Sequence, residues 1–417
     1  MNIFCKNFFG VIMDIVIIGG GLGGLLSGAI LSNKGHNITI YEKLPFVGGR
    51  FTNIPYKGYQ LTTGALHMVP HGADGFLGKC LKLANCNVKI VKSNPDGLFM
   101  VDGKIYSYKE LFNLVGVGDK LKGLKMALNL KLGRVDKSLS FGEFLEDMPL
   151  ALKIGNSFTG WALSLDAHHT PIDEIVEITK YYHKFGGPGI PIGGCKGIID
   201  SLVRVILSNG GKIITNYKID RVDIDFSEKK VYVNVDNNEN GEFDGVIFNI
   251  SPKDVEKISN VKIDKKGIPS KGIKVSIGSK KPLIDFNGVL FTTDCERVNG
   301  LNCPSNVDRS LSKEGYHLTM VHGAQIGNNV KKEIDIVLED IEYLFNLKGI
   351  DYDILHIQSY RDDIPVNHSS NGTDIDPIIY DNVFIVGDGA KGKGGIEVEG
   401  ISMGVLKVVD YINNNYQ

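Results

Sequence analysis

Five glycines lie within six consecutive positions near the amino terminus, directly after a short β-branched run. Read as G-x-G-x-x-G, the key positions are Gly19, Gly21 and Gly24. The first glycine allows a tight turn, the second lets the backbone approach a pyrophosphate, and the third lets a helix pack against a strand. Leu22 and Gly23 lie between these glycines, just before the expected helix, whose free N–H groups and dipole attract phosphate at its N-terminus. The spacing predicts a dinucleotide site.

The elements that must position this loop are present on both sides of it. Residues 14–18 (DIVII) are typical of a strand buried on both faces of a parallel sheet, and residues 25–33 predict a helix. Residues 37–42 predict a second strand that ends in Glu42, followed by Lys43. Glu42 lies 18 positions after Gly24, close to the offset of about 20 at which an acid meets ribose hydroxyls. We expect a β-α-β nucleotide-binding unit.

Glycine returns in clusters further along the chain. Just past the second expected strand come Gly48, Gly49 and Arg50, and a guanidinium at that place can pair with phosphate oxygens. Residues 382–388 (NVFIVGD) predict a buried strand that ends in Gly387 and Asp388, and residues 401–412 predict a closing helix. The positive end of that helix would stabilise negative charge on a bound group.

These segments resemble one known group of flavoproteins. The G-G-R turn, the late Gly-Asp, and the order P-x-G-G, helix, G-G, strand in residues 191–222 are similar to the FAD-dependent amine oxidase and phytoene desaturase superfamily. The resemblance implies an α/β fold with a discontinuous Rossmann-type FAD-binding domain and a second, α+β substrate domain. The implied boundaries are 13–70, 188–255 and 365–417 for the first domain, and 71–187 and 256–364 for the second.

The resemblance also implies roles for particular residues. Asp388 matches the aspartate that binds the ribityl or pyrophosphate part of FAD, and Ile219 matches a backbone contact to the adenine. The first turn of the closing helix, near Gly400, Ile401, Ser402 and Met403, matches the turn that faces the flavin. No cysteine follows Cys303, so a C-terminal cysteine link is absent and FAD is expected to be non-covalent. The expected cofactor-binding residues are Gly19, Gly21, Leu22, Gly23, Gly24, Glu42, Lys43, Gly48, Gly49, Arg50, Ile219, Gly387, Asp388, Gly400, Ile401, Ser402 and Met403.

Two histidines follow in the stretch 59–72, where related flavoproteins pass beside the flavin. His67 and His71 are the candidates for proton transfer, because histidine titrates near neutral pH. The alternative, which we favour, is that both are hydrogen-bonded structural residues and that the flavin carries most of the chemistry. His168 and His169 lie beside Asp166, but their spacing fits no common zinc pattern, so no metal site is expected.

The resemblance favours a phytoene desaturase-like enzyme that moves a hydride between flavin and a carbon of an apolar, isoprenoid-type substrate. One alternative is an amine oxidase or protoporphyrinogen oxidase-like flavoenzyme, although Trp161 is the only tryptophan available for an aromatic cage. Another is a flavin-free prenyl-lipid carrier of the same fold, and the presence of both Glu42 and Asp388 argues against it. The substrate's identity and the oligomeric state are left open by the sequence.

Composition limits the other partners. The formal net charge is −2, which gives no reason to expect a nucleic-acid partner. The six scattered cysteines form no C-x-x-C pair and favour a reducing, cytoplasmic setting. Residues 1–12 are short and apolar, and we expect Met13 to be the natural start. Residues 104–137 interleave cations with leucines, which predicts either a peripheral contact with an anionic membrane or a domain helix with a solvated basic face.

Overall fold

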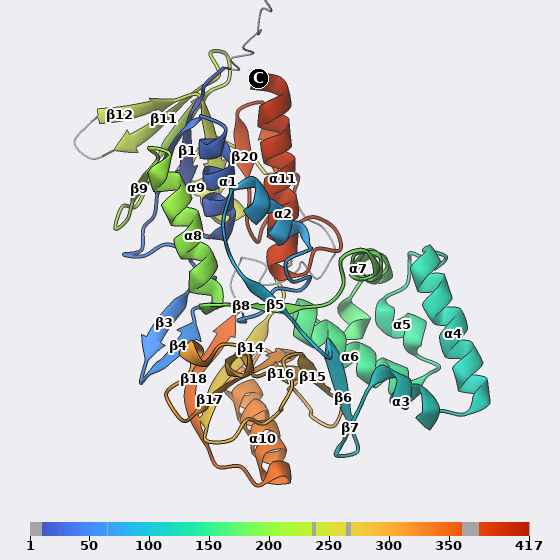
Figure 1. Ribbon diagram of the computed structural model, residues 1–417. Helices are drawn as coiled ribbons and strands as arrows, with labels where there is room; N and C mark the ends of the chain where they lie inside the picture. Colours follow the sequence, from blue (N-terminus) through green and yellow to red (C-terminus); the bar gives the residue numbers. More distant parts are fainter. Residues whose placement is uncertain (1–10, 65, 236–238, 264–267, 361–374, 417) are drawn as a thin grey trace, which may run out of the picture.

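The computed structural model describes residues 11–64, 66–235, 239–263, 268–360 and 375–416 (Figure 1). The boundary expected between 364 and 365, and most of the segment 1–12, lie outside the described residues. Two large sheets dominate the described part of the chain, one in the upper half of Figure 1 and one in the lower half.

The upper sheet is six-stranded, in the order β19-β20-β13-β1-β2-β9. Its strands are parallel except at the β19 edge. Ile15 and Ile17 of β1 pack in one core, whereas Val16 and Ile18 pack in another on the opposite face. Strand residues alternate between faces, so an all-apolar strand buries both. The strand bounds are β1 (Asp14–Ile18), β2 (Asn37–Tyr41), β9 (Lys212–Ile214), β13 (Gly245–Phe248), β19 (Ile378–Tyr380) and β20 (Val383–Ile385).

Helices cover one face of this sheet, and a small sheet covers the other. On the first face are α1 (Leu22–Asn33), α2 (Phe76–Leu83), α8 (Gly194–Ser208) and α11 (Glu397–Tyr416). On the second are β10 (Val222–Asp225), β11 (Lys230–Val235), β12 (Glu239–Phe243) and α9 (Pro252–Ile258). Covering both faces is the usual solution for a parallel sheet.

The lower sheet is seven-stranded, in the order β18-β14-β17-β16-β15-β6-β7. Helix α10 (Val330–Lys348) packs on one face, and Trp161 with the hairpin β3 (Asn53–Tyr56) and β4 (Tyr59–Thr62) lies against the other. The strand bounds are β6 (Gly97–Val101), β7 (Lys104–Tyr106), β14 (Gly272–Ser279), β15 (Val289–Thr292), β16 (Gly300–Asn302), β17 (His317–Ala324) and β18 (Tyr352–Tyr360).

A helical group lies beside the lower sheet, at the right of Figure 1. It comprises α3 (Tyr108–Leu114), α4 (Val117–Leu132), α5 (Phe141–Leu145), α6 (Pro149–Leu163) and α7 (Ile172–Phe185). The short strands β5 (Ile90–Lys92) and β8 (Gly189–Pro191) pair where the chain passes between the two halves. Within the described residues, no helix is both long and apolar enough to cross a membrane.

The predicted fold class, a Rossmann-type α/β domain with a second domain, is confirmed. Two helix starts differ from the prediction. Helix α1 begins at Leu22 rather than at residue 25, directly after the turn glycines. Helix α11 begins at Glu397 rather than at 401, and its first turn carries Glu397 and Glu399, acids that a helix N-terminus stabilises.

Candidate functional site

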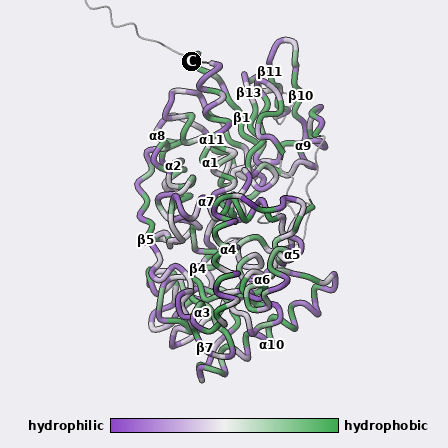
Figure 2. Tube along the Cα trace, turned by 90° about the vertical axis from the view of Figure 1, so that its right-hand side faces the viewer, coloured by the Kyte–Doolittle hydropathy of each residue, from purple (hydrophilic) through white to green (hydrophobic). Residues whose placement is uncertain are grey.

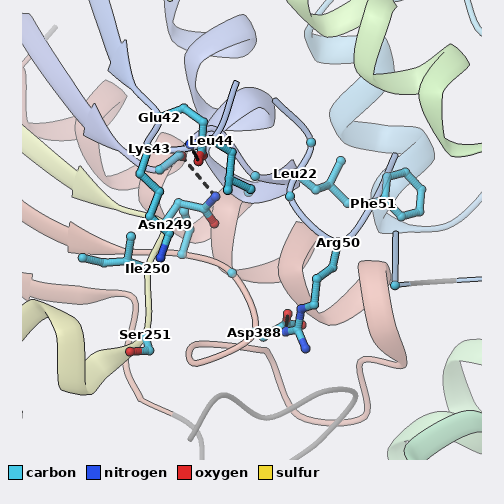
Figure 3. Close-up of a pocket in the computed structure, with 18 of the residues that line it drawn as sticks. Leu22, Glu42, Lys43, Leu44, Arg50, Phe51, Asn249, Ile250, Ser251 and Asp388 are labelled. Atoms are coloured by element: carbon cyan, nitrogen blue, oxygen red, sulfur yellow. Dashed lines mark hydrogen bonds and ion pairs between the residues drawn. The ribbon is translucent and has the colours of Figure 1, made fainter. Parts of the chain in front are cut away.

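A cavity of about 700 Å³ opens at the carboxyl ends of β1, β2, β13 and β20 (Figure 3). This end of a parallel sheet is where doubly wound folds bind their ligands, because several loops converge there. The predicted residues that line the cavity are Gly19, Gly21, Leu22, Gly23, Glu42, Lys43, Gly48, Gly49, Arg50, Ile219, Gly387, Asp388 and Ile401.

The first glycine loop is packed too tightly for larger side chains. Gly19 has φ +102°, and a Cβ there would lie 2.5 Å from the backbone oxygen of Asn249. A Cβ on Gly24 would collide with the backbone oxygen of Gly19, so Gly24 serves packing and does not line the cavity. The first turn of α1 has no side-chain cap and no acidic residue. Its open N–H groups at the cavity therefore suit an anionic ligand.

Glu42 has a structural role that the sequence did not reveal. Its Oε2 accepts a hydrogen bond from the Gly20 backbone N–H at 2.7 Å, and its Oε1 accepts one from the Leu44 N–H at 2.8 Å. The side chain thereby fixes the turn after β1 to the turn after β2. Each carboxylate oxygen can accept a further bond, so Glu42 can still meet a ligand hydroxyl in the cavity that it lines.

Asn249, just after β13, is a site residue that the prediction missed. Its Nδ2 donates to the Gly19 backbone oxygen at 3.2 Å. A Cβ on Gly21, Gly23 or Gly387 would come within 2.9 Å of its amide atoms. Asn249, which is labelled in Figure 3, thus lies where the first and last glycine segments meet. The sequence signal was its position directly after a buried strand, GVIF, which is what places it at the same sheet edge.

Arg50 and Asp388 form an ion pair across the cavity (Figure 3). The other oxygen of Asp388 lies 2.8 Å from Nζ of Lys391, whose side chain is fully buried. Burial acts to raise the pKa of Asp388, but Arg50 and Lys391 outweigh it and hold that pKa below its ordinary value. Asp388 is therefore a carboxylate at neutral pH.

The start of α11 lies at the cavity, but only one of the four residues predicted there, Ile401, lines it. Glu397, Val398 and Ile401 line it. The predicted Gly400, Ser402 and Met403 do not, because the helix starts earlier and turns them elsewhere. Gly400 packs on Gly395 and Lys391, the Ser402 hydroxyl donates to the Val398 carbonyl, and Met403 packs on Gly392.

Glu397 is a titratable group that the prediction missed. Its backbone has φ +45°, a conformation uncommon outside glycine. Burial raises the pKa of Glu397 to about 7, with Lys391 opposing and Asp388 adding to that rise. A carboxyl that changes protonation near neutral pH, at the end of a cavity, is suited to holding or releasing a proton.

Two tyrosines and an isoleucine form another part of the cavity lining, next to the charged residues Lys218 and Asp220. Tyr41 and Tyr217 face each other with ring centroids 5.2 Å apart, and Ile219 lines the cavity beside them. Ile219 is buried at the start of the segment that leads to β10. A flat base would find apolar and aromatic surfaces here.

His67 and His71 both lie outside the residues that line the cavity. The Cys195 N–H donates to Nδ1 of His67, so Nε2 carries the proton and donates to the Gln60 carbonyl at 2.8 Å. Burial lowers the pKa of His67 to about 4. Nδ1 of His71 hydrogen-bonds the Gly186 carbonyl at 2.8 Å, and burial lowers its pKa too. These contacts support the structural reading of both residues.

Where His67 and His71 do not reach the cavity, polar residues of the lower sheet do. Lys274 of β14 pairs in register with His322 of β17 and Gln358 of β18. His322 and Tyr360 line the cavity. The Tyr360 hydroxyl donates to the Gly64 carbonyl, and Nε2 of His322 lies 2.9 Å from the Ser164 hydroxyl. Sequence spacing gave no signal for this group, because sheet pairing brings its members together.

Lys274 is fully buried beneath this row. Its Nζ donates to the carbonyl and hydroxyl oxygens of Thr62, at the end of β4. Burial lowers the pKa of Lys274 to about 7. Among the described residues, no group of three or more His, Cys, Asp or Glu is placed to hold a metal ion.

Comparison with known proteins adds to this geometry. Residues 17–78 match the model of an NAD(P)-binding Rossmann-like domain. An uncharacterised protein from Methanocaldococcus jannaschii is 62% identical over 96% of this chain and 100% of its own length. The crystal structure of an oxidoreductase from Methanosarcina mazei is 37% identical, with a TM-score of 0.89, and covers 95% of this chain and 100% of its own.

Shorter matches are to carotenoid enzymes. A 4,4'-diapolycopen-4-al dehydrogenase from Metabacillus indicus is 30% identical over 23% of this chain and 20% of its own length. A 4,4'-diapophytoene desaturase from Methylomonas is 28% identical over 24% and 20%. The chain belongs to the FAD-dependent amine oxidase and phytoene desaturase superfamily.

Membership in this superfamily confirms the resemblance and the prediction of an FAD-type oxidoreductase. A putrescine oxidase structure covers 97% of this chain and 100% of its own with a TM-score of 0.66, but at 14% identity it shows the fold alone. Of the glycine segments that carry the resemblance, those at 19–23, 48–49 and 387–389 line the cavity described above, whereas Gly193 and Gly194 do not.

Proposed function

We propose that the cavity binds FAD non-covalently, with the adenine at the Tyr41 and Tyr217 end. The observation that carries this proposal is that four separate segments, which contain Gly23, Arg50, Ile219 and Asp388, line one cavity. The uncapped first turn of α1 supports it, because that turn offers N–H groups to a pyrophosphate. None of the described cysteines lines the cavity.

In this proposal the chain's residues bind and orient the cofactor. Glu42 accepts hydrogen bonds from ribose hydroxyls, and Arg50 with Asp388 contacts the middle of the dinucleotide. The first turn of α11 lies at the ring end, where the positive helix end favours negative charge. When bound, the flavin supplies a centre that accepts or donates a hydride. Glu397 holds or releases the accompanying proton at its carboxyl oxygen.

The cofactor test is purification of the full chain under native conditions, followed by denaturation in acid. Release of FAD, identified by mass and by its absorption spectrum, is the expected result. A colourless protein that does not take up added FAD would contradict the proposal and favour a flavin-free lipid carrier. Release of NAD(P) instead would assign the same cavity to a nicotinamide cofactor.

We further propose that the substrate is apolar and of isoprenoid type, and that a hydride moves between the flavin and one of its carbons. The short matches to carotenoid desaturases support this class. A second cavity of about 430 Å³ supports it too, since nearly all its lining side chains are apolar. Phe99 and Phe158 of that cavity meet Phe291, which packs against the apolar cluster that also contains Leu66 of the first cavity.

The substrate test is anaerobic reduction of the FAD-loaded protein by a panel of polyisoprenoids, amines and porphyrinogens, followed at the flavin absorption band. Bleaching by a polyisoprenoid, or reoxidation of reduced flavin by an unsaturated one, is expected. Bleaching by an amine or a porphyrinogen alone would reject the isoprenoid class and leave FAD binding intact.

A further inference from the structure

Helix α4 carries an apolar stripe that faces solvent. With 3.6 residues per turn, Val117, Leu121, Leu124, Leu128 and Leu132 fall on one side of the helix. Their exposed fractions range from 49% to 75%. Contiguous apolar patches of this kind are rare on the surface of monomeric proteins and mark interaction sites.

The opposite side of α4 is turned toward the protein. Asp119, Gly123, Met126, Ala127 and Leu130 line the apolar cavity of about 430 Å³ that α4 shares with α3, α5 and α6. Asp119, the only acid of α4, is itself exposed but lies on this side of the helix, away from the stripe. The helix is therefore apolar on two faces. One face borders the cavity within the chain, and the other, the exposed stripe, is not covered by the described residues.

Lysines border the exposed stripe on both sides. On the helical wheel, Lys120 and Lys131 lie along one edge and Lys125 along the other. Lys122 lies farther round and pairs with Asp147 at 2.8 Å. Long cationic side chains beside an apolar stripe place their charges at phosphate level while the stripe enters the hydrocarbon boundary.

Helix α4 lies at the periphery of the fold, where an extended planar surface such as a bilayer can reach it. In Figure 1 the helix lies at the outer right edge of the molecule, and Figure 2, which views that side, shows it toward the reader. Its 16 residues are about 24 Å long. We propose that α4 docks in the plane of an anionic lipid bilayer through this stripe and its flanking lysines.

A second copy of the chain fits this face less well. In a twofold contact the same surface occurs on both partners, so the lysine edges of the two stripes would meet. Like charges brought together oppose association, whereas lipid phosphates attract the same lysines. The proposal is independent of the flavin chemistry, because docking needs neither cofactor nor substrate.

The test is flotation of the full chain with vesicles. The protein should float with equimolar phosphatidylcholine and phosphatidylglycerol, float poorly with phosphatidylcholine alone, and be partly released by salt. Leu121→Gln/Leu124→Gln/Leu128→Gln should weaken vesicle binding by at least about tenfold. Lys120→Gln/Lys125→Gln/Lys131→Gln should weaken binding to the anionic vesicles by about fivefold for each lysine.

The matched control is Leu207→Gln/Leu347→Gln, which changes leucines 52% and 44% exposed on α8 and α10. It should float as the unchanged protein does. The leucine variants should keep their melting temperature, since the changed side chains are exposed, and the lysine variant should lose only the contact of Lys120 with the Phe112 ring. Flotation unaffected by the α4 changes, flotation equal on both vesicle types, or no flotation at all would overturn the proposal. So would a lipid-free dimer that the leucine changes convert to monomer.

Discussion

Arg50 and Asp388 lie 338 positions apart in the sequence and form an ion pair in the folded chain. Arg50 directly follows the glycine pair at 48–49. Asp388 lies just after strand β20, at the start of the last glycine-rich segment. The pair therefore joins the first and last parts of the nucleotide-binding half at the cavity that both residues line.

This ion pair leads to the first prediction. Asp388→Asn should lower FAD affinity by at least about tenfold and cost about 2 kcal/mol of stability, because Arg50 and buried Lys391 both lose a charged acceptor. Flavin fluorescence titration and thermal melting measure the two effects. Asp147→Asn removes an exposed partner of Lys122 and should change neither. Unaltered flavin affinity in Asp388→Asn would remove Asp388 from the binding site.

Glu42 should be needed for the shape of the loop as well as for the ligand. Glu42→Gln replaces one acceptor oxygen by an N–H₂ group that faces the Gly20 or Leu44 N–H. An unsatisfied buried donor costs about 1–3 kcal/mol. We expect a lower melting temperature even without FAD, and weaker FAD binding. Glu314→Gln, at an exposed position, serves as the control. A variant that melts normally while losing FAD would assign Glu42 to the ligand alone.

The spectrum of the FAD-loaded protein should depend on pH near neutrality. Burial raises the pKa of Glu397 to about 7, so its carboxyl is neutral below that pH and ionised above it. The flavin absorption band should shift across about pH 6 to 8, and Glu397→Gln should abolish the shift. Glu399→Gln should retain it, because Glu399 does not line the cavity. A shift that persists in Glu397→Gln would assign the titration to another group.

Glu399 should make the protein less stable as pH rises, whereas an acid in a salt bridge makes a protein less stable as pH falls. Its Oε2 accepts from the Phe76 and Leu77 N–H groups, and burial raises its pKa to about 7. The ordinary value, about 4.3, holds in the unfolded chain. Its contribution is thus most favourable below about pH 4.3 and is lost as pH rises to 7, at a cost of at most about 4 kcal/mol.

The measurement is the melting temperature as a function of pH. The decrease between about pH 4 and 7 should be smaller in Glu399→Gln, whose carbonyl oxygen can still accept from the start of α2. Part of the decrease should remain, because Glu397 acts in the same direction. An equal decrease in the variant and the unchanged protein would show that Glu399 is not the group responsible.

His67 should prove structural. His67→Ala leaves the Gln60 carbonyl and the Cys195 N–H without their side-chain partner, which should cost about 2–3 kcal/mol. The rate of flavin reduction per folded molecule, and its pH profile, should be unchanged. His169→Ala, which removes an exposed imidazole that hydrogen-bonds Asp166, controls for stability. His322→Ala, inside the cavity lining, should change the rate. A changed pH profile in His67→Ala would return His67 to a catalytic role.

Much of the nucleotide half could be predicted, because its key features are local. Gly19 and Gly387 adopt φ values of +102° and +104°, which few other residues tolerate, so glycine at these turns is readable in the sequence. The buried strand before each turn is marked by its own β-branched residues. The position of Glu42, 18 residues after Gly24, predicted it as a site residue. Its hydrogen bonds to the Gly20 and Leu44 N–H groups could not be predicted in this way.

The sequence by itself therefore determined the turns, the strands before them and the superfamily, since each depends on residues close together in the chain. Tertiary structure alone decided that Asn249 fills the meeting point of the glycine segments, that Glu397 starts the closing helix, and that His322 and Tyr360 reach the cavity. It also decided which apolar face of α4 is exposed. The physical reason is that sheet register and helix packing bring together residues whose separation in sequence carries no signal of their contact.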